Sequence, residues 1–262
     1  MNNLKINPVL EEKKITSFIS DVLKTQGFDN VIIGLSGGID SALSLSLVRK
    51  VVDPKNIFVA HLYYFKSQIN SLLPFLKKAN IPQKNIYNIS IKNVVGQTAK
   101  AAGLTKNSKD YQTRLGNMMA RTRMILLYDL AKKHQGLVCG TENKSELFLG
   151  YFTRFGDEAS DFEPIQHLYK TQVYQLAKHL NIPEKIISQA PSAGLYDNQT
   201  DEKDFGFSYE EADKVLDIYL NNKKSVSKTI LKNFPNAQKI FDWVNKNSFK
   251  HHLPHTIKQL TT

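Results

Sequence analysis

The sequence is poor in cysteine, because Cys139 stands alone among 262 residues. A single cysteine excludes an internal disulfide framework and a cysteine-rich zinc site, and we expect Cys139 to be a buried core residue. Long apolar runs are also missing, since none approaches the roughly 18 residues that a membrane-spanning helix needs. The first residues, Met1 to Lys5, lack the apolar core of a signal peptide. We therefore expect a cytoplasmic protein with no membrane partner.

Arginine is the second scarce residue type. Lysine and arginine total 35 against 24 acidic residues, a net charge of +11, yet the only arginines are Arg49, Arg114, Arg121, Arg123 and Arg154. A nucleic-acid-binding protein gathers its positive charge on one face or along one helix. Here the lysines are spread along the chain, so we expect a solvated lysine-rich surface and no nucleic-acid partner. A positively charged entrance to a binding site would also suit a polyanionic small molecule.

Apolar strand patterns alternate with helical patterns along the chain. Strands are predicted at residues 31–35, 57–63, 85–91 and 137–140, and helices after Asn7-Pro8, at 40–52, 68–79 and 110–134, from Glu142, and at 171–181, 208–220, 225–234 and 237–246. This alternation is typical of a parallel sheet with helices on both faces. We predict a single domain over residues 1–262, with an α/β fold: a doubly wound (Rossmann-like) parallel sheet and a helical C-terminal extension.

The most informative stretch connects the first predicted strand to the next helix. It comprises Gly34, Leu35, Ser36, Gly37, Gly38, Ile39, Asp40 and Ser41. The glycines allow a tight turn and a close approach to a ligand, and the serines with the helix N-terminus can hold a phosphate group. Asp40 would repel phosphate unless a cation lay between them. The loop therefore predicts a nucleotide phosphate bound together with Mg²⁺.

Three other interpretations of this loop differ in what they require. A Walker A motif fails, because no lysine follows the glycines. A serine-hydrolase nucleophile elbow fits the same glycines and would make Ser36 a nucleophile, with His179, His251 or His252 as its partner. The third is an ordinary strand-to-helix turn with good capping residues. The last two stay open at this level.

A second polar motif follows the fourth predicted strand, and ligands of such sheets bind beyond the carboxyl ends of the strands. Thr141 stands at a helix start, where its hydroxyl can meet a phosphate, and Glu146 lies about one turn further on. Glu146 and Asp40 together can supply oxygen ligands to one Mg²⁺, which binds one or two carboxylates plus phosphate oxygens. The alternative is a capping pair with a solvent-facing glutamate.

Two further segments place charge among apolar residues. The long predicted helix carries Asn117 and Arg121 along one stripe, which suits a bound phosphate or carboxylate as well as a surface ion pair. The loop at residues 150–164 mixes aromatic residues with Arg154 and Asp161, so it can hold a planar ring beside charged or hydroxyl groups.

These motifs together carry a resemblance. They are Ser-Gly-Gly-x-Asp-Ser, Asn-x-x-Ala-Arg-x-Arg, Gly-Thr-Glu-x-x-x-Glu and Gly-Tyr-Phe-Thr-Arg-Phe-Gly-Asp, followed by Asp161, Pro164 and Leu168-Tyr169-Lys170. The first is similar to the pyrophosphatase loop of the N-type ATP pyrophosphatases. The whole set resembles the ammonia-dependent NAD⁺ synthetases within that group, from about residue 30 to residue 210 and more weakly to Pro254.

The resemblance implies a reaction and an assembly. ATP would adenylate the pyridine carboxylate of nicotinic acid adenine dinucleotide (deamido-NAD) with release of pyrophosphate, and ammonia would displace AMP to give NAD⁺. Members of the family are homodimers in which the long arginine-bearing helix helps to form the interface, so we expect a homodimer here.

The same resemblance implies roles for individual residues. The metal ligands would be Asp40 and Glu146, and the catalytic residues Lys170 and Asp157. The ATP-binding set would be Gly34, Leu35, Ser36, Gly37, Gly38, Ile39, Asp40, Ser41, Thr141, Lys170 and Ser192, and the substrate-binding set Arg121, Arg154, Asp161, Phe249 and Lys250.

Three positions depart from the family pattern. His61 stands where the family has an arginine near the adenine of ATP, and Ser192 replaces a threonine but keeps the hydroxyl. Phe249-Lys250 replaces a His-Lys pair, so only the lysine keeps the family's side chain. No glutaminase domain precedes the loop, and Cys139 is misplaced to be its nucleophile. We therefore expect ammonia, either directly or from a separate subunit, as the nitrogen donor.

Three other functions remain open beside this one. A tRNA-modifying ATP pyrophosphatase would explain the basic charge but neither the arginine-bearing helix nor the aromatic loop. A serine hydrolase requires a reactive Ser36. A non-catalytic nucleotide sensor would keep the loop but has no need of Glu146 and Lys170 in register.

Overall fold

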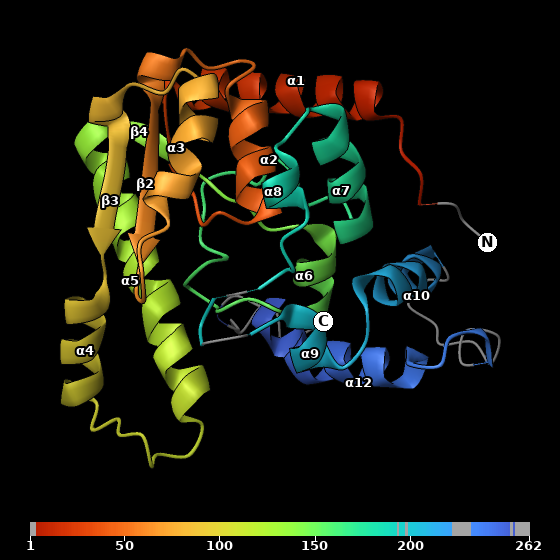
Figure 1. The fold of residues 1–262 in the computed structure, drawn as a ribbon. Helices are drawn as coiled ribbons and strands as arrows, with labels where there is room; N and C mark the ends of the chain where they lie inside the picture. Colours follow the sequence, from red (N-terminus) through yellow and green to blue (C-terminus); the bar gives the residue numbers. More distant parts are fainter. Residues whose placement is uncertain (1–3, 193, 197–198, 222–231, 252–253, 255–262) are drawn as a thin grey trace.

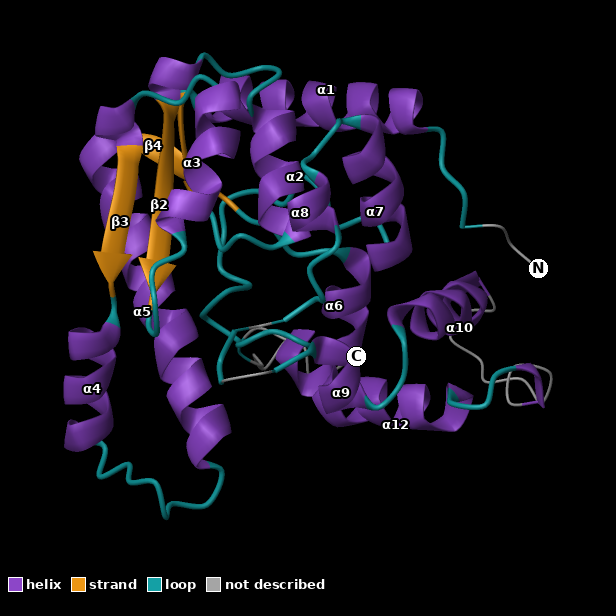
Figure 2. Ribbon diagram, in the orientation of Figure 1, coloured by secondary structure: helices purple, strands orange, loops and turns teal. Residues whose placement is uncertain are grey.

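The computed structural model describes residues 4–192, 194–196, 199–221, 232–251 and 254. Its centre is a four-stranded parallel sheet in the order β3-β2-β1-β4 (Figures 1 and 2). The strands are β1 (Asn30–Gly34), β2 (Ile57–Tyr63), β3 (Ile86–Ser90) and β4 (Gly136–Cys139). In this register Gly34 lies beside Ala60, and Ile33 lies beside Cys139. The predicted parallel α/β sheet is confirmed.

Helices cover both faces of the sheet (Figure 1). The first face carries α1 (Pro8–Gln26), α2 (Ile39–Val48), α3 (Ile69–Lys78), α7 (Lys170–His179) and α8 (Glu184–Ile187). The second face carries α4 (Lys92–Ala101) and α5 (Tyr111–His134). Side chains of a strand alternate between the faces, so Ile33 packs in the first core and the adjacent Ile32 in the second. Both are fully buried, which is why β1 is a continuous apolar run.

A third layer of helices packs beyond the carboxyl ends of the strands. It contains α6 (Lys144–Leu149), α9 (Asp201–Phe205), α10 (Tyr209–Asn221), α12 (Ala237–Asn247) and the 3₁₀ helix η3 (Ser248–His251). Leu149, Phe205, Leu216 and Phe241 are buried together in its core. Because α10 contacts both α6 and α7, this layer joins the sheet domain through those helices. It is the predicted helical C-terminal extension.

Several elements differ from the sequence prediction. The helices α4, α8 and α9 and the 3₁₀ helices η1 (Pro54–Asn56) and η2 (Gln83–Asn85) were not predicted. In α4 only Val95 is buried, so the helix has little apolar periodicity. The helix expected from Glu142 begins at Lys144, after the N-cap Asn143. Residues 225–231 of the helix predicted at 225–234 lie outside the described residues.

Candidate active site

A cavity of about 1260 Å³ opens at the carboxyl ends of β1, β2 and β4. This edge is where parallel sheets of this kind bind ligands. The cavity is lined by all the predicted site residues except Asp161, namely residues 34–41, Arg121, Thr141, Glu146, Arg154, Asp157, Lys170, Ser192, Phe249 and Lys250. The structure thus gathers them in one space, and their roles toward particular ligands stay predictions.

The loop between β1 and α2 has the geometry of an anion cradle. Gly37 has φ +100°, a backbone conformation that favours glycine. The Ser36 hydroxyl accepts from the Gly38 N–H at 3.1 Å and lies 3.1 Å from the Ser41 hydroxyl, which donates to the Gly38 carbonyl at 3.0 Å. The N-cap of α2 is Gly38, which has no side chain to cap the helix, so the first amides of α2 can bind a ligand.

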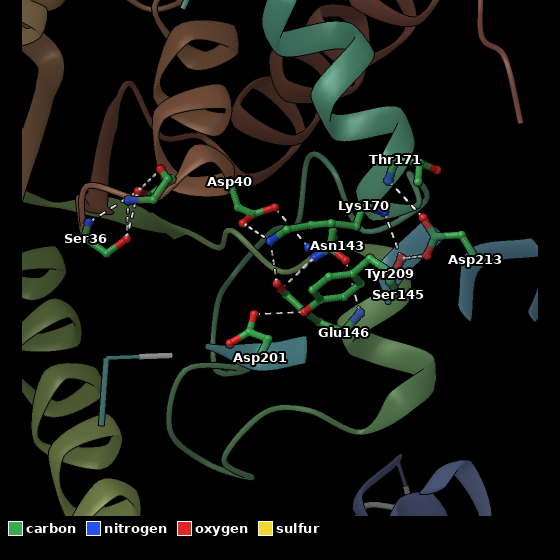
Figure 3. A network of polar contacts seen from close by, with 12 residues as sticks. Ser36, Asp40, Asn143, Ser145, Glu146, Lys170, Thr171, Asp201, Tyr209 and Asp213 are labelled. Atoms are coloured by element: carbon green, nitrogen blue, oxygen red, sulfur yellow. Dashed lines mark hydrogen bonds and ion pairs between the residues drawn. The ribbon is translucent and has the colours of Figure 1, made fainter. Parts of the chain in front are cut away.

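Lys170 binds two carboxylates at the centre of the site (Figure 3). Its Nζ lies 2.6 Å from Asp40 Oδ2 and 3.0 Å from Glu146 Oε1, and its side chain is only 2% exposed. Burial lowers the pKa of Lys170, but the two carboxylates outweigh it and the pKa lies above its usual range. Burial raises the pKa of Glu146, and Lys170 opposes that shift. The Asn143 amide completes the group by donating to Asp40 Oδ1 at 2.9 Å.

The backbone of Lys170 is fixed by the C-terminal layer. Its N–H donates to Ser145 Oγ at 2.8 Å, and the Ser145 hydroxyl donates in turn to the buried Asp213 of α10. The other Asp213 oxygen accepts from the Thr171 N–H at 2.9 Å, so a carboxyl group caps the N-terminus of α7. Burial raises the pKa of Asp213 to about 6 against these hydrogen bonds. The three helices α6, α7 and α10 thereby position the ammonium group (Figure 3).

Tyr209 and Asp201 lie below the same lysine. The Tyr209 hydroxyl donates to Asp201 Oδ2 at 3.0 Å, and its ring centroid lies 5.2 Å from Lys170 Nζ, a cation-π contact. Burial raises the pKa of Asp201, with Lys170 opposing the shift. Sequence reasoning missed Asn143, Asp201, Tyr209 and Asp213. Only the capping pattern before α6 offered a signal, and it pointed to Asn143.

A second acid pair lies behind the end of β4. The Glu142 N–H donates to Glu163 Oε2 at 3.0 Å, Ser160 donates to Glu163 Oε1 at 2.8 Å, and Gln166 donates to Glu142 Oε2 at 2.9 Å. The remaining oxygen, Glu142 Oε1, is buried without a hydrogen-bond partner in the described residues. Burial raises the pKa of Glu142 to about 9 and that of Glu163 to about 8.

Two of the predicted substrate residues, Arg121 and Lys250, donate hydrogen bonds to backbone carbonyls of the loop after α6. The Arg121 guanidinium donates to the Arg154 carbonyl at 3.2 and 3.3 Å. Lys250 Nζ donates to the carbonyls of Gly150 at 2.6 Å and Phe152 at 2.9 Å, while burial lowers its pKa. Phe249 is 58% exposed at the rim. These contacts join the loop after α6 to α5 and to η3.

Asp157 and Asp161 lie differently in that loop. Asp157 lines the cavity and accepts from the Thr153 N–H at 2.8 Å, and burial raises its pKa. Asp161 is absent from the cavity lining, and its Oδ2 accepts from the Val138 N–H at 2.7 Å on the edge of β4. Asp161 thus extends the sheet edge, and its predicted contact with substrate stays a prediction.

Within the described ranges, none of the histidines that the hydrolase interpretation names is hydrogen-bonded to Ser36. The Ser36 hydroxyl is bound to Ser41 and Gly38, whereas His179 is paired with Glu12 at 3.0 Å. The ring of His251 lies 5.7 Å from that of Phe152, and His252 falls outside the described residues. A catalytic triad at Ser36 is therefore not supported.

Comparison with known proteins points in one direction. Residues 11–254 match the family model described as NAD synthase. The NH(3)-dependent NAD(+) synthetase of Chlorobium phaeobacteroides is 36% identical over 256 residues, which cover 96% of this chain and 90% of the relative. No helix among the described residues is long and apolar enough to cross a membrane.

Solved structures agree with the sequence match. An NMN synthetase from Francisella tularensis superimposes with a TM-score of 0.81 at 33% identity, covering 96% of this chain and 99% of that one. An NH3-dependent NAD synthetase from Campylobacter jejuni, in complex with the nitrate ion, gives a TM-score of 0.78 at 30% identity, covering 97% of this chain and all of that one.

Proposed function

The chain belongs to the NAD synthase family, and on that premise we propose that it is a ligase that amidates deamido-NAD with ammonia while ATP is converted to AMP and pyrophosphate. The observation that carries the proposal is the meeting of an anion-binding loop with Asp40, Lys170 and Glu146 in one cavity. A phosphate-transfer site needs this combination of donors, a cation and carboxylates.

The chemistry explains why the loop and the lysine lie together. The pyridine carboxylate is a poor electrophile, so AMP is first transferred to one of its oxygens as pyrophosphate leaves. Ammonia then attacks the acyl carbon, AMP departs, and the nitrogen loses a proton. Negative charge grows on the phosphate oxygens, and we assign its stabilisation to the loop amides, Ser36, Ser41 and Lys170.

Asp40 and Glu146 fit a magnesium ion. Mg²⁺ prefers oxygen ligands and commonly takes one or two carboxylates plus phosphate oxygens. The described residues contain no group of three or more His, Cys, Asp or Glu that could hold a metal ion by themselves, which suits a cation shared with ATP. Bound there, the cation would neutralise phosphate charge. Because Lys170 Nζ now contacts both carboxylates, it must release at least one of them.

The remaining residues are assigned to the acceptor. We assign Arg121, Arg154 and Lys250 to the charged groups of deamido-NAD, since all three line the cavity. Asp157 lines it too, and its raised pKa suits a group that takes a proton from the attacking nitrogen. Thr141 and Ser192 offer hydroxyls to ATP, and Phe249 offers a ring face at the rim.

The test is product formation from Mg-ATP and deamido-NAD, with and without ammonium. We expect NAD⁺, AMP and pyrophosphate in equal amounts only when ammonium is present. Formation of AMP without NAD⁺ would mean that the protein is an ATP pyrophosphatase with a different acceptor, such as the tRNA of a tRNA-modifying enzyme. No substrate-dependent AMP at all would overturn the proposal. Asp40→Asn is the matched inactive control, because it removes the carboxylate charge and keeps the size.

A second acceptor is favoured by one comparison. The Francisella structure with a TM-score of 0.81 is described as an NMN synthetase. Nicotinic acid mononucleotide carries the same pyridine carboxylate as deamido-NAD, so the two acceptors differ only in the adenylate half. The ratio of kcat/KM for the two acceptors decides between them.

We also propose a cytoplasmic homodimer. Ile125 of α5 is a large apolar side chain that is 59% exposed. A homodimer through α5 would cover it. Light scattering after gel filtration should give twice the 29.8 kDa chain mass, and Ile125→Glu should shift it toward the monomer.

A further inference from the structure

His61 of β2 is buried and uses both nitrogens of its ring. The ring is 5% exposed, its Nδ1 lies 2.8 Å from the Leu35 carbonyl oxygen, and its Nε2 lies 3.1 Å from the Gln68 amide nitrogen. A backbone amide can only donate, so Nε2 accepts and carries no proton. Nδ1 then carries the proton and donates to Leu35. The neutral ring satisfies both backbone groups.

Both partners border the phosphate-binding loop. Leu35 follows the last residue of β1 and directly precedes Ser36, and its own N–H donates to the Ala60 carbonyl at 2.9 Å. Both backbone groups of Leu35 are therefore tied to β2, one by the strand and one by the His61 ring. The loop starts from a residue that has little freedom to rotate.

Gln68 brings a third element to the same point. It is the N-cap of α3 and has no side-chain cap of its own. Its Oε1 lies 3.5 Å from where a Cβ on Gly37 would stand, so the start of α3 borders the loop. One imidazole thus connects β1, β2 and α3 around residues 36–41.

We propose that His61 is a positioning residue that sets the phosphate-binding loop through the Leu35 carbonyl and thereby determines ATP affinity. The proposal rests on the proposed function only in naming ATP as the ligand of the loop. Since both ring nitrogens are bound to backbone, His61 does not replace an arginine that reads the adenine base. Its effect reaches ATP through the loop.

Two isosteric substitutions separate the two hydrogen bonds. The Asn amide nitrogen can stand near the Nδ1 position, so His61→Asn keeps the donor to Leu35 and loses the acceptor for Gln68. The Gln carbonyl oxygen can reach the Nε2 position, so His61→Gln keeps the acceptor and loses the donor to Leu35. Substituting His179, which pairs with Glu12 away from the cavity, by Asn and Gln controls for the chemistry of the change.

The readouts are the dissociation constant for ATP and the steady-state constants. We expect His61→Gln to weaken ATP binding about tenfold, the effect of one lost hydrogen bond, with kcat and the KM for deamido-NAD within about twofold. His61→Asn should bind ATP within about threefold of the wild type. Equal weakening by the two variants, or an equal rise in the KM for deamido-NAD, would overturn the proposal.

Hydrogen exchange makes the result independent of turnover. Amides of residues 36–41 should exchange faster in His61→Gln than in His61→Asn, while exchange in α1 and β3 stays unchanged. If the protein bound no ATP, the proposed function would fail, but the difference in loop exchange would still test the positioning role. Loss of exchange protection throughout the sheet in both variants would mean that His61 stabilises the core as a whole, which would contradict the proposal.

Discussion

Two pairs of acidic residues near the end of β4, Asp40 with Glu146 and Glu142 with Glu163, differ in the partners that they have when buried. Asp40 and Glu146 share the ammonium group of Lys170 at 2.6 and 3.0 Å. Glu142 and Glu163 receive hydrogen bonds only from neutral donors in the described part of the chain: a backbone amide, Ser160 and Gln166. The first pair has a cationic partner close to the predicted phosphate site. The second has none among its hydrogen-bond donors, and burial raises the pKa of Glu142 to about 9 and of Glu163 to about 8.

The difference indicates which of the buried carboxyl groups can bind a cationic ligand. A buried carboxylate with a cationic partner can exchange that partner for another cation, such as a metal ion. A buried carboxylic acid without one is stable only as the neutral form and behaves as a hydrogen-bonding core residue. This difference supports the proposed metal binding at Asp40 and Glu146, and it predicts a structural role for Glu142 and Glu163.

Of the changes that test this comparison, removing Lys170 should have the largest effect on stability and turnover. Lys170→Met leaves Asp40 and Glu146 without their cation, which should lower the free energy of unfolding by about 3–5 kcal/mol at neutral pH. Turnover should fall below detection, and urea melts monitored by circular dichroism would measure the stability. Lys214→Met, which removes an exposed partner of Glu210, is the control and should change neither. A Lys170→Met protein of wild-type stability would refute the paired-charge account.

Neutralising the second pair should change how stability depends on pH. Unfolded glutamic acid ionises near its ordinary pKa of 4.5, whereas folded Glu142 holds its proton until about pH 9. The folded state binds more protons in that window, so this group's contribution to wild-type stability is complete below pH 4.5 and is lost as the pH rises through 9.

Glu142→Gln abolishes that loss. The stability advantage of the variant over the wild type should be near zero at pH 5 and grow by up to about 1.4 kcal/mol per pH unit above it. Denaturant melts at pH 5, 7 and 8.5 measure this. Glu184→Gln, an exposed change at the start of α8, should run parallel to the wild type. A parallel curve for Glu142→Gln would mean that the second pair is charged.

Asn143 lies between the two pairs and should have the smallest effect. Its side chain caps α6 by accepting from the Glu146 N–H at 3.0 Å and donates to Asp40. Asn143→Ala removes both bonds and should cost about 1 kcal/mol of stability. Asn143→Ser can keep the cap but cannot reach Asp40. It should therefore restore stability in thermal melts, while its KM for Mg-ATP, like that of Asn143→Ala, should lie above the wild-type value. Equal KM values for Asn143→Ser and wild type would exclude a role of the Asp40 contact.

The sequence allowed the local half of the site to be predicted. Residues 34–41, Thr141 and Glu146 follow strands that apolar patterns identify, and sheet topology brings their ends together. Asp201, Tyr209 and Asp213 were missed because they come from helices far along the chain and reach Lys170 only through tertiary packing. The burial of Glu142 could not be predicted either, because a glutamate near the start of a helix is usually exposed to solvent. Likewise α4 was missed because it buries only Val95.

The lone thiol of Cys139 gives this protein a built-in reporter. It is 2% exposed at the end of β4 and borders the cavity, and burial raises its pKa well above the usual range. Thiol reagents attack the thiolate, so they can label it only when this edge of the sheet opens. Labelling kinetics under native conditions therefore measure one opening reaction at one known position. A ligand that binds only the closed state slows labelling by the factor 1 + [L]/Kd, so nucleotide affinity can be titrated on the unmodified protein without turnover.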